Sequence, residues 1–171
     1  VVSEDALRRA LERIDEAASA VWMRPSLMHS VREALDRPWV LDIDASIKPL
    51  YGRQAGAEVS YNPHKPGRPS HVVHTYWVGN LRLVLHAQLQ SGKSHTPTHG
   101  LPGLKALLER LPRAQRPQLV RGDCAYGSDT VMRELEDLQQ PYLFKLKQSA
   151  GVKKLVQRQW RQREWLDAGQ G

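Results

Sequence analysis

The sequence contains a single cysteine, Cys124, among 171 residues. One thiol excludes an internal disulfide framework and a cysteine-rich zinc site, and it fits a reducing cytoplasm. No apolar run approaches the roughly 20 residues that a membrane span needs. The first residues also lack a basic stretch followed by an apolar one, so no secretory signal is predicted. We therefore expect a cytoplasmic protein with no membrane partner.

Acidic residues are in the minority. Lys and Arg total 25 against 18 Asp and Glu, which gives a formal net charge of +7. This balance favours a polyanionic partner such as nucleic acid, although many soluble proteins are equally basic without binding one. The densest basic tract covers residues 145–163 and contains no acid.

The basic tract has helical spacing over residues 152–163. In a helix, Lys154, Arg158 and Arg161 share one face, which suits contact with DNA phosphates. The opposite face would then pack on a core, and it carries Val152, Leu155, Val156 and Trp160. An ordinary solvated basic face is the alternative interpretation.

Apolar spacing and turn residues predict the order of the elements. Residues 51–71 are rich in Gly and Pro and predict a long excursion, whereas Gly79 and Asn80 predict a tight hairpin. We expect helices at about 4–20, 25–37, 103–111, 128–140 and 152–163, and strands at about 39–45, 72–79, 81–90, 118–121 and 142–147.

Two of the predicted strands carry acids, one within the strand and the other directly after it. Asp42 and Asp44 lie two residues apart in the first strand and therefore share one face, while Asp123 directly follows the strand near 118–121. A buried carboxylate is costly unless it is paired or holds a cation, and Mg²⁺ prefers such oxygen ligands. Acids at neighbouring strand ends therefore predict a metal site. The alternative is that these acids are solvated or cap turns.

Several segments resemble insertion-sequence transposases of bacteria that carry a DDE catalytic domain. The string at 61–71 is the most specific of them, and the resemblance extends over nearly the whole chain. The segments are LDIDAS at 41–46, YG at 51–52 with GA at 56–57, YNPHKPGRPSH at 61–71 and VRGDCAYG at 120–127.

The resemblance implies an α/β fold, a ribonuclease-H-like mixed sheet flanked by helices. It also implies that the catalytic and metal-binding acids are Asp44 and Asp123, with Asp44 matching the family position better than Asp42. The cofactor would be Mg²⁺, with Mn²⁺ as a possible substitute. DNA contacts would come from His64, Lys65 and Arg68 in the long excursion, together with the basic face of 152–163.

The family's third acid is a Glu on a helix after an inserted segment, and none of Glu134, Glu136 and Glu164 fits that position. We therefore expect an incomplete catalytic core at 38–150, preceded by a helical connector at 1–37 and followed by the start of an insertion at 151–171. The chain lacks a starting Met and ends in a turn-like tail, so we expect both ends to continue in a longer protein.

The expected function is DNA strand cleavage and strand transfer by the whole protein, with this fragment inactive alone. Its partners would be the transposon ends, target DNA and further copies in a homodimer or larger oligomer. Two other interpretations stay open: a metal-dependent nuclease of the same fold, and a non-catalytic DNA-binding remnant. The histidines at 71, 74, 86, 95 and 99 match no recognised zinc spacing.

Overall fold

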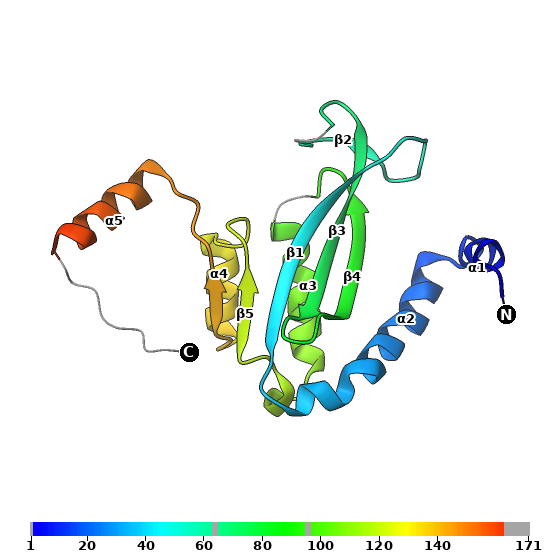
Figure 1. Ribbon diagram of the computed structural model, residues 1–171, viewed down its shortest axis with the longest axis horizontal. Helices are drawn as coiled ribbons and strands as arrows, with labels where there is room; N and C mark the ends of the chain where they lie inside the picture. The colour runs from blue at the N-terminus through cyan, green and yellow to red at the C-terminus, as the bar shows by residue number, and fades with distance from the viewer. Residues whose placement is uncertain (1, 63–64, 95–96, 163–171) are drawn as a thin grey trace.

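A computed structural model describes residues 2–62, 65–94 and 97–162 (Figure 1). Three helical segments and then four strands come first, and helices alternate with strands in the rest of the described chain. The elements are α1 (Glu4–Leu11), α2 (Glu16–Val31), the 3-10 helix η1 (Arg32–Asp36), β1 (Val40–Pro49), β2 (Glu58–Val59), β3 (Pro69–Val78), β4 (Leu83–Ser91), α3 (Pro97–Arg110), the 3-10 helix η2 (Arg113–Gln115), β5 (Leu119–Gly122), α4 (Asp129–Asp137), β6 (Tyr142–Phe144) and α5 (Ala150–Gln162).

The strands form one mixed sheet in the order β2-β3-β1-β5-β6, with β4 also paired to β3. β1, β3 and β4 are antiparallel neighbours, whereas β5 is parallel to β1 and β6 is parallel to β5. Parallel neighbours need a crossover, and α3 and α4 supply the crossovers before β5 and β6. The mixed topology agrees with the α/β fold class expected from the sequence.

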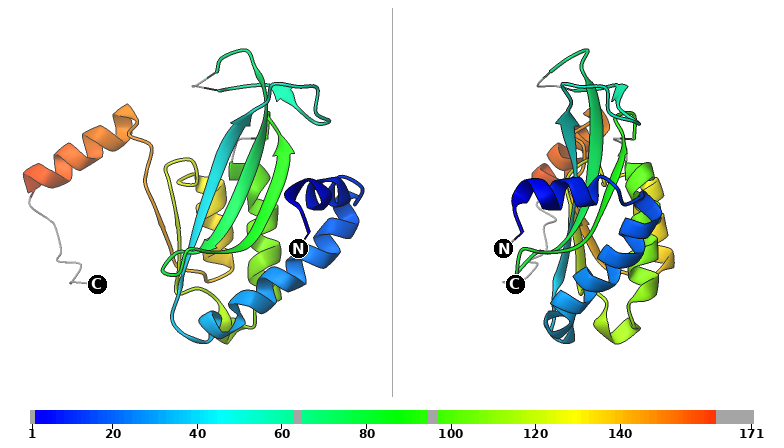
Figure 2. Two further views of the ribbon diagram at one scale, coloured as in Figure 1. Left: turned by 45° about the vertical axis from the view of Figure 1, so that its right-hand side comes forward. Right: turned by 90° about the vertical axis from the view of Figure 1, so that its right-hand side faces the viewer.

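The core lies between the sheet and the helices α3 and α4, which cover the same face (Figure 2). Burial alternates along β1 and β3, as expected for strands with one covered face. The other face of β1 carries Asp42 and Asp44. The core residues include Leu41 and Ile43 of β1, Tyr76 and Val78 of β3, Leu104, Leu107 and Leu108 of α3, Val120 of β5, and Val131 and Leu135 of α4.

The N-terminal helices break at a different place from the one predicted. The stripe over 4–20 predicted one helix, but α1 ends at Leu11 and α2 begins at Glu16. Asp15 caps α2, because its carboxylate accepts a hydrogen bond from the Ala18 N–H at 2.7 Å. Pro25 lies inside α2 instead of starting a helix. The capping acid therefore determines this boundary, and the proline does not.

Other boundaries also differ from the prediction. The hairpin loop between β3 and β4 spans residues 79–82, because Arg82 takes a positive φ of 54° and lengthens the turn beyond Gly79 and Asn80. β3 begins at Pro69, inside the predicted excursion, where it pairs with β1 and β2. α3 begins at Pro97 and accommodates Pro102 in its first turns. Ser128 occupies the predicted N-cap position of α4, but its side chain makes no capping hydrogen bond.

The predicted helix at the basic tract exists as α5, but its apolar face does not pack on a core. Leu155, Val156 and Trp160 are 50%, 48% and 72% exposed. α5 extends away from the sheet beyond β6 (Figure 1). The expectation of a core side for this helix is therefore wrong for the described part of the chain, because the sheet ends at β6 and offers α5 no surface.

His86 predicts an acid-dependent loss of stability. This β4 residue is buried, and its ring stacks on Tyr76 with centroids 5.4 Å apart. Burial, together with the nearby positive charges of Arg24 and Arg110, lowers the pKa of His86 to about 4. The unfolded chain therefore binds a proton below pH 6.5 that the folded chain does not, so stability falls as the pH drops toward 4.

We expect the free energy of unfolding to decrease by on the order of 2 kcal/mol from His86 between pH 7 and 4.5. Urea unfolding at a series of pH values measures this slope. His86→Phe keeps a stacked ring and should flatten the slope, leaving the part due to His74, whose pKa burial also lowers. His29→Phe, on an exposed position of α2, is the control. An unchanged slope in His86→Phe would contradict the assignment.

Candidate active site

The predicted neighbouring strands are adjacent in the sheet. β1 and β5 run parallel, and their pairing ends with Asp42 opposite Arg121 and Ile43 opposite Gly122. Asp44 and Asp123 are the next residue on each strand. The sheet therefore brings the ends of the two acid-bearing segments side by side, as the sequence predicted.

The same alternation directs Asp44 to the face opposite α3 and α4, because Ile43 is buried against them. Gly122 also faces the helices: a Cβ there would touch Ile43, Tyr126 and Phe144. The residue after it, Asp123, then belongs on the face of Asp44. Asp44 and Asp123 are both exposed.

Each of these carboxylates is oriented by a local hydrogen bond. The Ser46 hydroxyl donates to Asp44 Oδ2 at 3.2 Å, and the Ala125 N–H donates to Asp123 Oδ1 at 2.9 Å. Among the described residues, neither acid forms an ion pair. Both keep lone pairs that a cation would use.

Tyr126 lies near enough to both acids for their charges to affect the pKa of its hydroxyl. Its ring is buried beside Phe144, and burial raises the pKa of its hydroxyl. Tyr76, Asp44 and Asp123 raise that pKa further. Both carboxylates therefore raise the pKa of the same hydroxyl, which agrees with the position of Asp44 on β1 beside the end of β5.

Asp42 is held in a different way, by hydrogen bonds from Arg121, and this partner was not predicted from the sequence. Arg121 Nε donates to Asp42 Oδ1 at 2.7 Å and Arg121 Nη2 donates to Oδ2 at 2.8 Å. These hydrogen bonds raise the pKa of Arg121. Gly79 leaves room for the carboxylate, since a Cβ at that position would overlap Asp42 Oδ2. The only signal for Arg121 was its position two residues before Asp123, on the same face.

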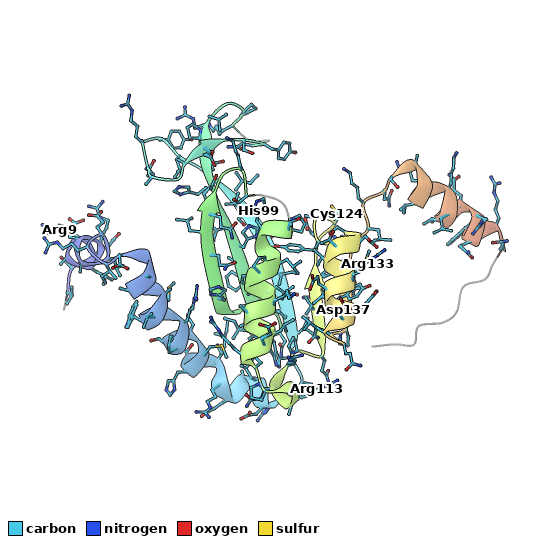
Figure 3. The ribbon with its side chains drawn as sticks, turned by 180° about the vertical axis from the view of Figure 1, so that it is seen from behind. Arg9, His99, Arg113, Cys124, Arg133 and Asp137 are labelled. Atoms are coloured by element: carbon cyan, nitrogen blue, oxygen red, sulfur yellow. The ribbon has the colours of Figure 1, made fainter. Side chains whose placement is uncertain are left out.

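The donor chemistry at Asp44 and Asp123 fits a hard divalent cation, because carboxylate oxygens are the ligands that Mg²⁺ and Mn²⁺ take. Within residues 2–62, 65–94 and 97–162, no group of three His, Cys, Asp or Glu is close enough to hold a metal ion. Asp44 and Asp123 are therefore two candidate ligands, and a third is not found beside them in the described part of the chain. Cys124, the residue after Asp123, is a free and exposed cysteine (Figure 3).

The proposed DNA-contact residues fall into two separate groups. Lys65 and Arg68 belong to the excursion beyond the end of β1 and β3, where Arg68 lies 4.4 Å over the centroid of the Tyr51 ring. Lys154, Arg158 and Arg161 lie on α5, beyond β6 (Figure 1). His64 lies outside the described residues.

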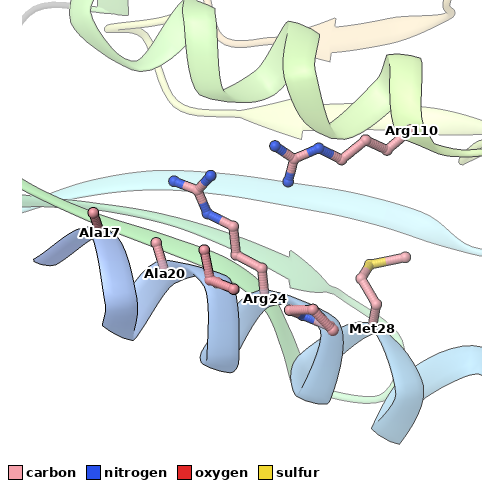
Figure 4. A pocket seen from close by; sticks show the side chains of 7 residues that line it. Ala17, Ala20, Arg24, Met28 and Arg110 are labelled. Carbon is pink, nitrogen blue, oxygen red and sulfur yellow. The ribbon is translucent and has the colours of Figure 1, made fainter.

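A cavity on the described part of the chain is remote from the acids. It has a volume of about 810 Å³ and lies between α2 and the end of α3, where Arg24 and Arg110 point toward each other (Figure 4). Both helices lie away from the exposed acid face. This cavity is therefore not part of the candidate active site. Its lining residues are Ala17, Ala20, Val21, Arg24, Pro25, Met28 and Arg110.

The family model for the transposase DDE domain, group 1, matches residues 1–167. The chain belongs to the DDE-domain transposase family. The mixed α/β sheet flanked by helices that was expected from the sequence is confirmed by the strand order and the helices α3 and α4. No curated protein sequence matches the chain. No helix in the described part of the chain is long and apolar enough to cross a membrane.

Solved structures with a similar arrangement include the piggyBac transposase synaptic complex with hairpin DNA, at 17% identity and a TM-score of 0.49. The chain covers 36% of that protein, and the match covers 92% of this chain. The catalytic core domain of BIV integrase matches at 12% identity and a TM-score of 0.42, over 73% of this chain and 66% of that one. The HTLV-2 integrase core in complex with magnesium matches at 12% identity and 0.41, over 74% of each chain.

Gly79 generates a prediction about this site. Gly79→Ala should lower the free energy of unfolding by about 1–3 kcal/mol, because the added methyl group overlaps the Asp42 carboxylate. Gly151→Ala is the matched control, since a Cβ there meets only Ser149 Oγ at 3.8 Å. Urea unfolding of both variants measures the difference. Equal stability of the two variants would show that Asp42 is not confined by Gly79.

Proposed function

We propose that this chain is the first part of the catalytic core of a DNA transposase that cleaves strands at transposon ends and joins them to target DNA. The observation that carries the proposal is the parallel pairing of β1 and β5. It brings Asp44 and Asp123 to one exposed face, where neither forms an ion pair with a described residue, in a chain of the DDE-domain transposase family.

In this proposal Asp44 and Asp123 hold Mg²⁺, with Mn²⁺ as a substitute. When bound, the metal supplies Lewis acidity to an in-line displacement at phosphorus. The chain's own residues position the two carboxylates for this reaction. Ser46 and the Ala125 N–H orient the carboxylates, and the buried Tyr126 supports the loop that carries Asp123.

The third acid of the site comes from outside this chain in this proposal. Glu134 and Glu136 lie on α4 and are already engaged: Lys105 Nζ donates to Glu134 at 2.6 Å, and the Tyr142 hydroxyl donates to Glu136 at 2.8 Å. Glu164 lies outside the described residues. Residues 38–150 then form a partial core between a connector at 1–37 and an insertion that begins at 151.

The basic residues would bind DNA backbone on both sides of the acids. Lys65 and Arg68, with His64, would contact phosphates from the excursion, and Lys154, Arg158 and Arg161 would contact them from α5. The partners are transposon ends, target DNA and further copies of the transposase. Exposed cations at two sites suit a long duplex better than a small ligand.

The acids generate the central prediction. In the whole transposase, Asp44→Asn and Asp123→Asn should each abolish strand cleavage and strand transfer while leaving DNA binding unchanged, because each removes one metal-binding charge and little volume. Gel assays with labelled end-mimicking duplexes measure cleavage, transfer and binding. Asp129→Asn, an exposed acid of α4, is the control.

Cleavage that survives both substitutions would refute the proposal. Cleavage without strand transfer in the wild type would instead identify a nuclease, and binding without cleavage would identify a DNA-binding remnant.

The basic tract generates a second prediction, about this chain alone. It should bind duplex DNA weakly and without sequence preference, and it should not cut it, because two acids leave the metal poorly held. Each phosphate contact contributes a slope of about −0.9 to the plot of log affinity against log salt. Replacing Lys154, Arg158 and Arg161 together by Gln should therefore make that slope shallower by up to about 2.7.

The matched control replaces Arg8, Arg9 and Arg13 of the N-terminal region by Gln, which changes the net charge equally. Equal slopes for the two triple variants would show that α5 makes no specific phosphate contact. Metal-dependent nicking by the isolated chain that disappears in Asp123→Asn would show that its own acids complete the site.

A further inference from the structure

We propose that Arg121 is a positioning residue, which ties β5 to β1 through Asp42 and thereby sets the separation of Asp44 and Asp123. The proposal rests on the proposed function, because it assigns the two acids to a metal site. It also gives Asp42 a structural role distinct from that of Asp44.

The pairing of β5 to β1 is short. β5 has four residues, and its ladder to β1 ends at Ile43 opposite Gly122. Asp123 therefore follows the last paired residue and gains no further backbone constraint from β1. The last cross-strand side-chain contact before it is the fork between Arg121 and Asp42. A planar bidentate pair fixes orientation as well as distance.

Asp42 is itself confined, so it provides a fixed anchor for Arg121. It lies opposite Trp77 of β3 on one side and opposite Arg121 on the other. Gly79 closes the remaining space, and its N–H donates to the Val40 carbonyl at 2.8 Å. The β3–β4 hairpin, β1 and β5 are therefore connected in a row two residues before the two acids.

The fork also controls charge on this face. Asp42 and Asp44 are two residues apart on one strand, a separation of about 7 Å. Without Arg121, Asp42 would be a third negative charge beside Asp44 and Asp123, and it would compete for a cation. With Arg121 in place, both oxygens of Asp42 accept hydrogen bonds from the guanidinium. Asp44 is then the acid of β1 that is available to metal.

The pair is too exposed to be important mainly for folding. The side chains of Arg121 and Asp42 are 54% and 32% exposed, and such ion pairs contribute little to stability. A positioning role therefore predicts an effect on the metal requirement of the reaction and only a small effect on unfolding. This contrast separates positioning from a merely structural contact.

The test measures strand cleavage by the whole transposase as a function of magnesium concentration. Arg121→Met keeps much of the side-chain volume and removes the fork, so the concentration for half-maximal cleavage should rise roughly ten-fold or more, as for other residues that orient metal ligands. Arg121→Lys, which donates from a single nitrogen, should give an intermediate rise. Asp42→Asn should also raise the half-maximal concentration, because it removes the same fork, but by less than Arg121→Met, because no competing carboxylate is left.

The double variant Asp42→Asn with Arg121→Met should be no worse than Arg121→Met alone, because both changes remove the same interaction. The matched control is Arg133→Met, which removes another Arg–Asp pair, at 2.9 Å to Asp129 on the exposed side of α4. It should leave the magnesium requirement unchanged. Thermal unfolding of each variant accompanies the assay, and Arg121→Lys gives the reading if Arg121→Met fails to fold.

An Arg121→Met protein with the magnesium requirement of Arg133→Met would overturn the positioning role, even if Asp44→Asn and Asp123→Asn abolish cleavage. Loss of all cleavage in Asp42→Asn, with only a modest effect in Arg121→Met, would overturn it too and identify Asp42 as the catalytic acid. Normal cleavage in Asp44→Asn and Asp123→Asn would instead refute the proposed function and, with it, the basis of this inference.

Discussion

The parallel pairing of β1 with β5 is the interaction on which the candidate site depends. Asp44 and Asp123 are 79 residues apart in the sequence, and their proximity requires these two strands to be neighbours in a fixed register. That register requires α3 to cross the sheet face, and α3 packs there because its leucines are buried in the same core as Leu41, Ile43 and Val120. The core therefore determines which acids meet.

One face of the sheet packs against the helices and forms the core, and the other face holds the acids of β1. Leu41 and Ile43 point into the core, whereas Asp42 and Asp44 alternate with them on the opposite face. A shift of one residue in the pairing would bury both acids and expose both apolar side chains. The cost of burying the carboxylates therefore helps to define the register that the site needs.

Much of the fold follows from the sequence, because the signals that predicted it are local. The apolar stripe and N-cap position of α4, the short strand at β5 and the acid-bearing strand at β1 are all recognisable from spacing and turn residues. Apolar spacing alone did not locate the break at Asp15, the four-residue loop at 79–82 or the start of β3 at Pro69. Those boundaries depend on a side-chain cap, a positive φ and pairing with distant strands.

The candidate site was also only partly predictable, because some of its contacts join residues that are distant in the sequence. The acids themselves were found from strand periodicity and from the family resemblance. Arg121 was not found, because an arginine on a strand has no sequence signal that names a partner 79 residues away. Gly79 was expected only as a turn residue, and its second role appears only when the Asp42 carboxylate is in place beside it.

Asp42 forms an ion pair with Arg121, whereas Asp44 and Asp123 form none among the described residues, although all three acids belong to one sheet face. The exposure of Asp44 and Asp123 explains this difference. A solvated carboxylate needs no counter-charge, so folding imposes no ion pair on Asp44 or Asp123. Asp42 lies one step further into the sheet, between Trp77, Gly79 and Arg121, and there a fork of hydrogen bonds replaces the lost water. The folded chain thus neutralises the one acid that it confines. The other two acids form no ion pair within the described residues, so their negative charge stays exposed on this face.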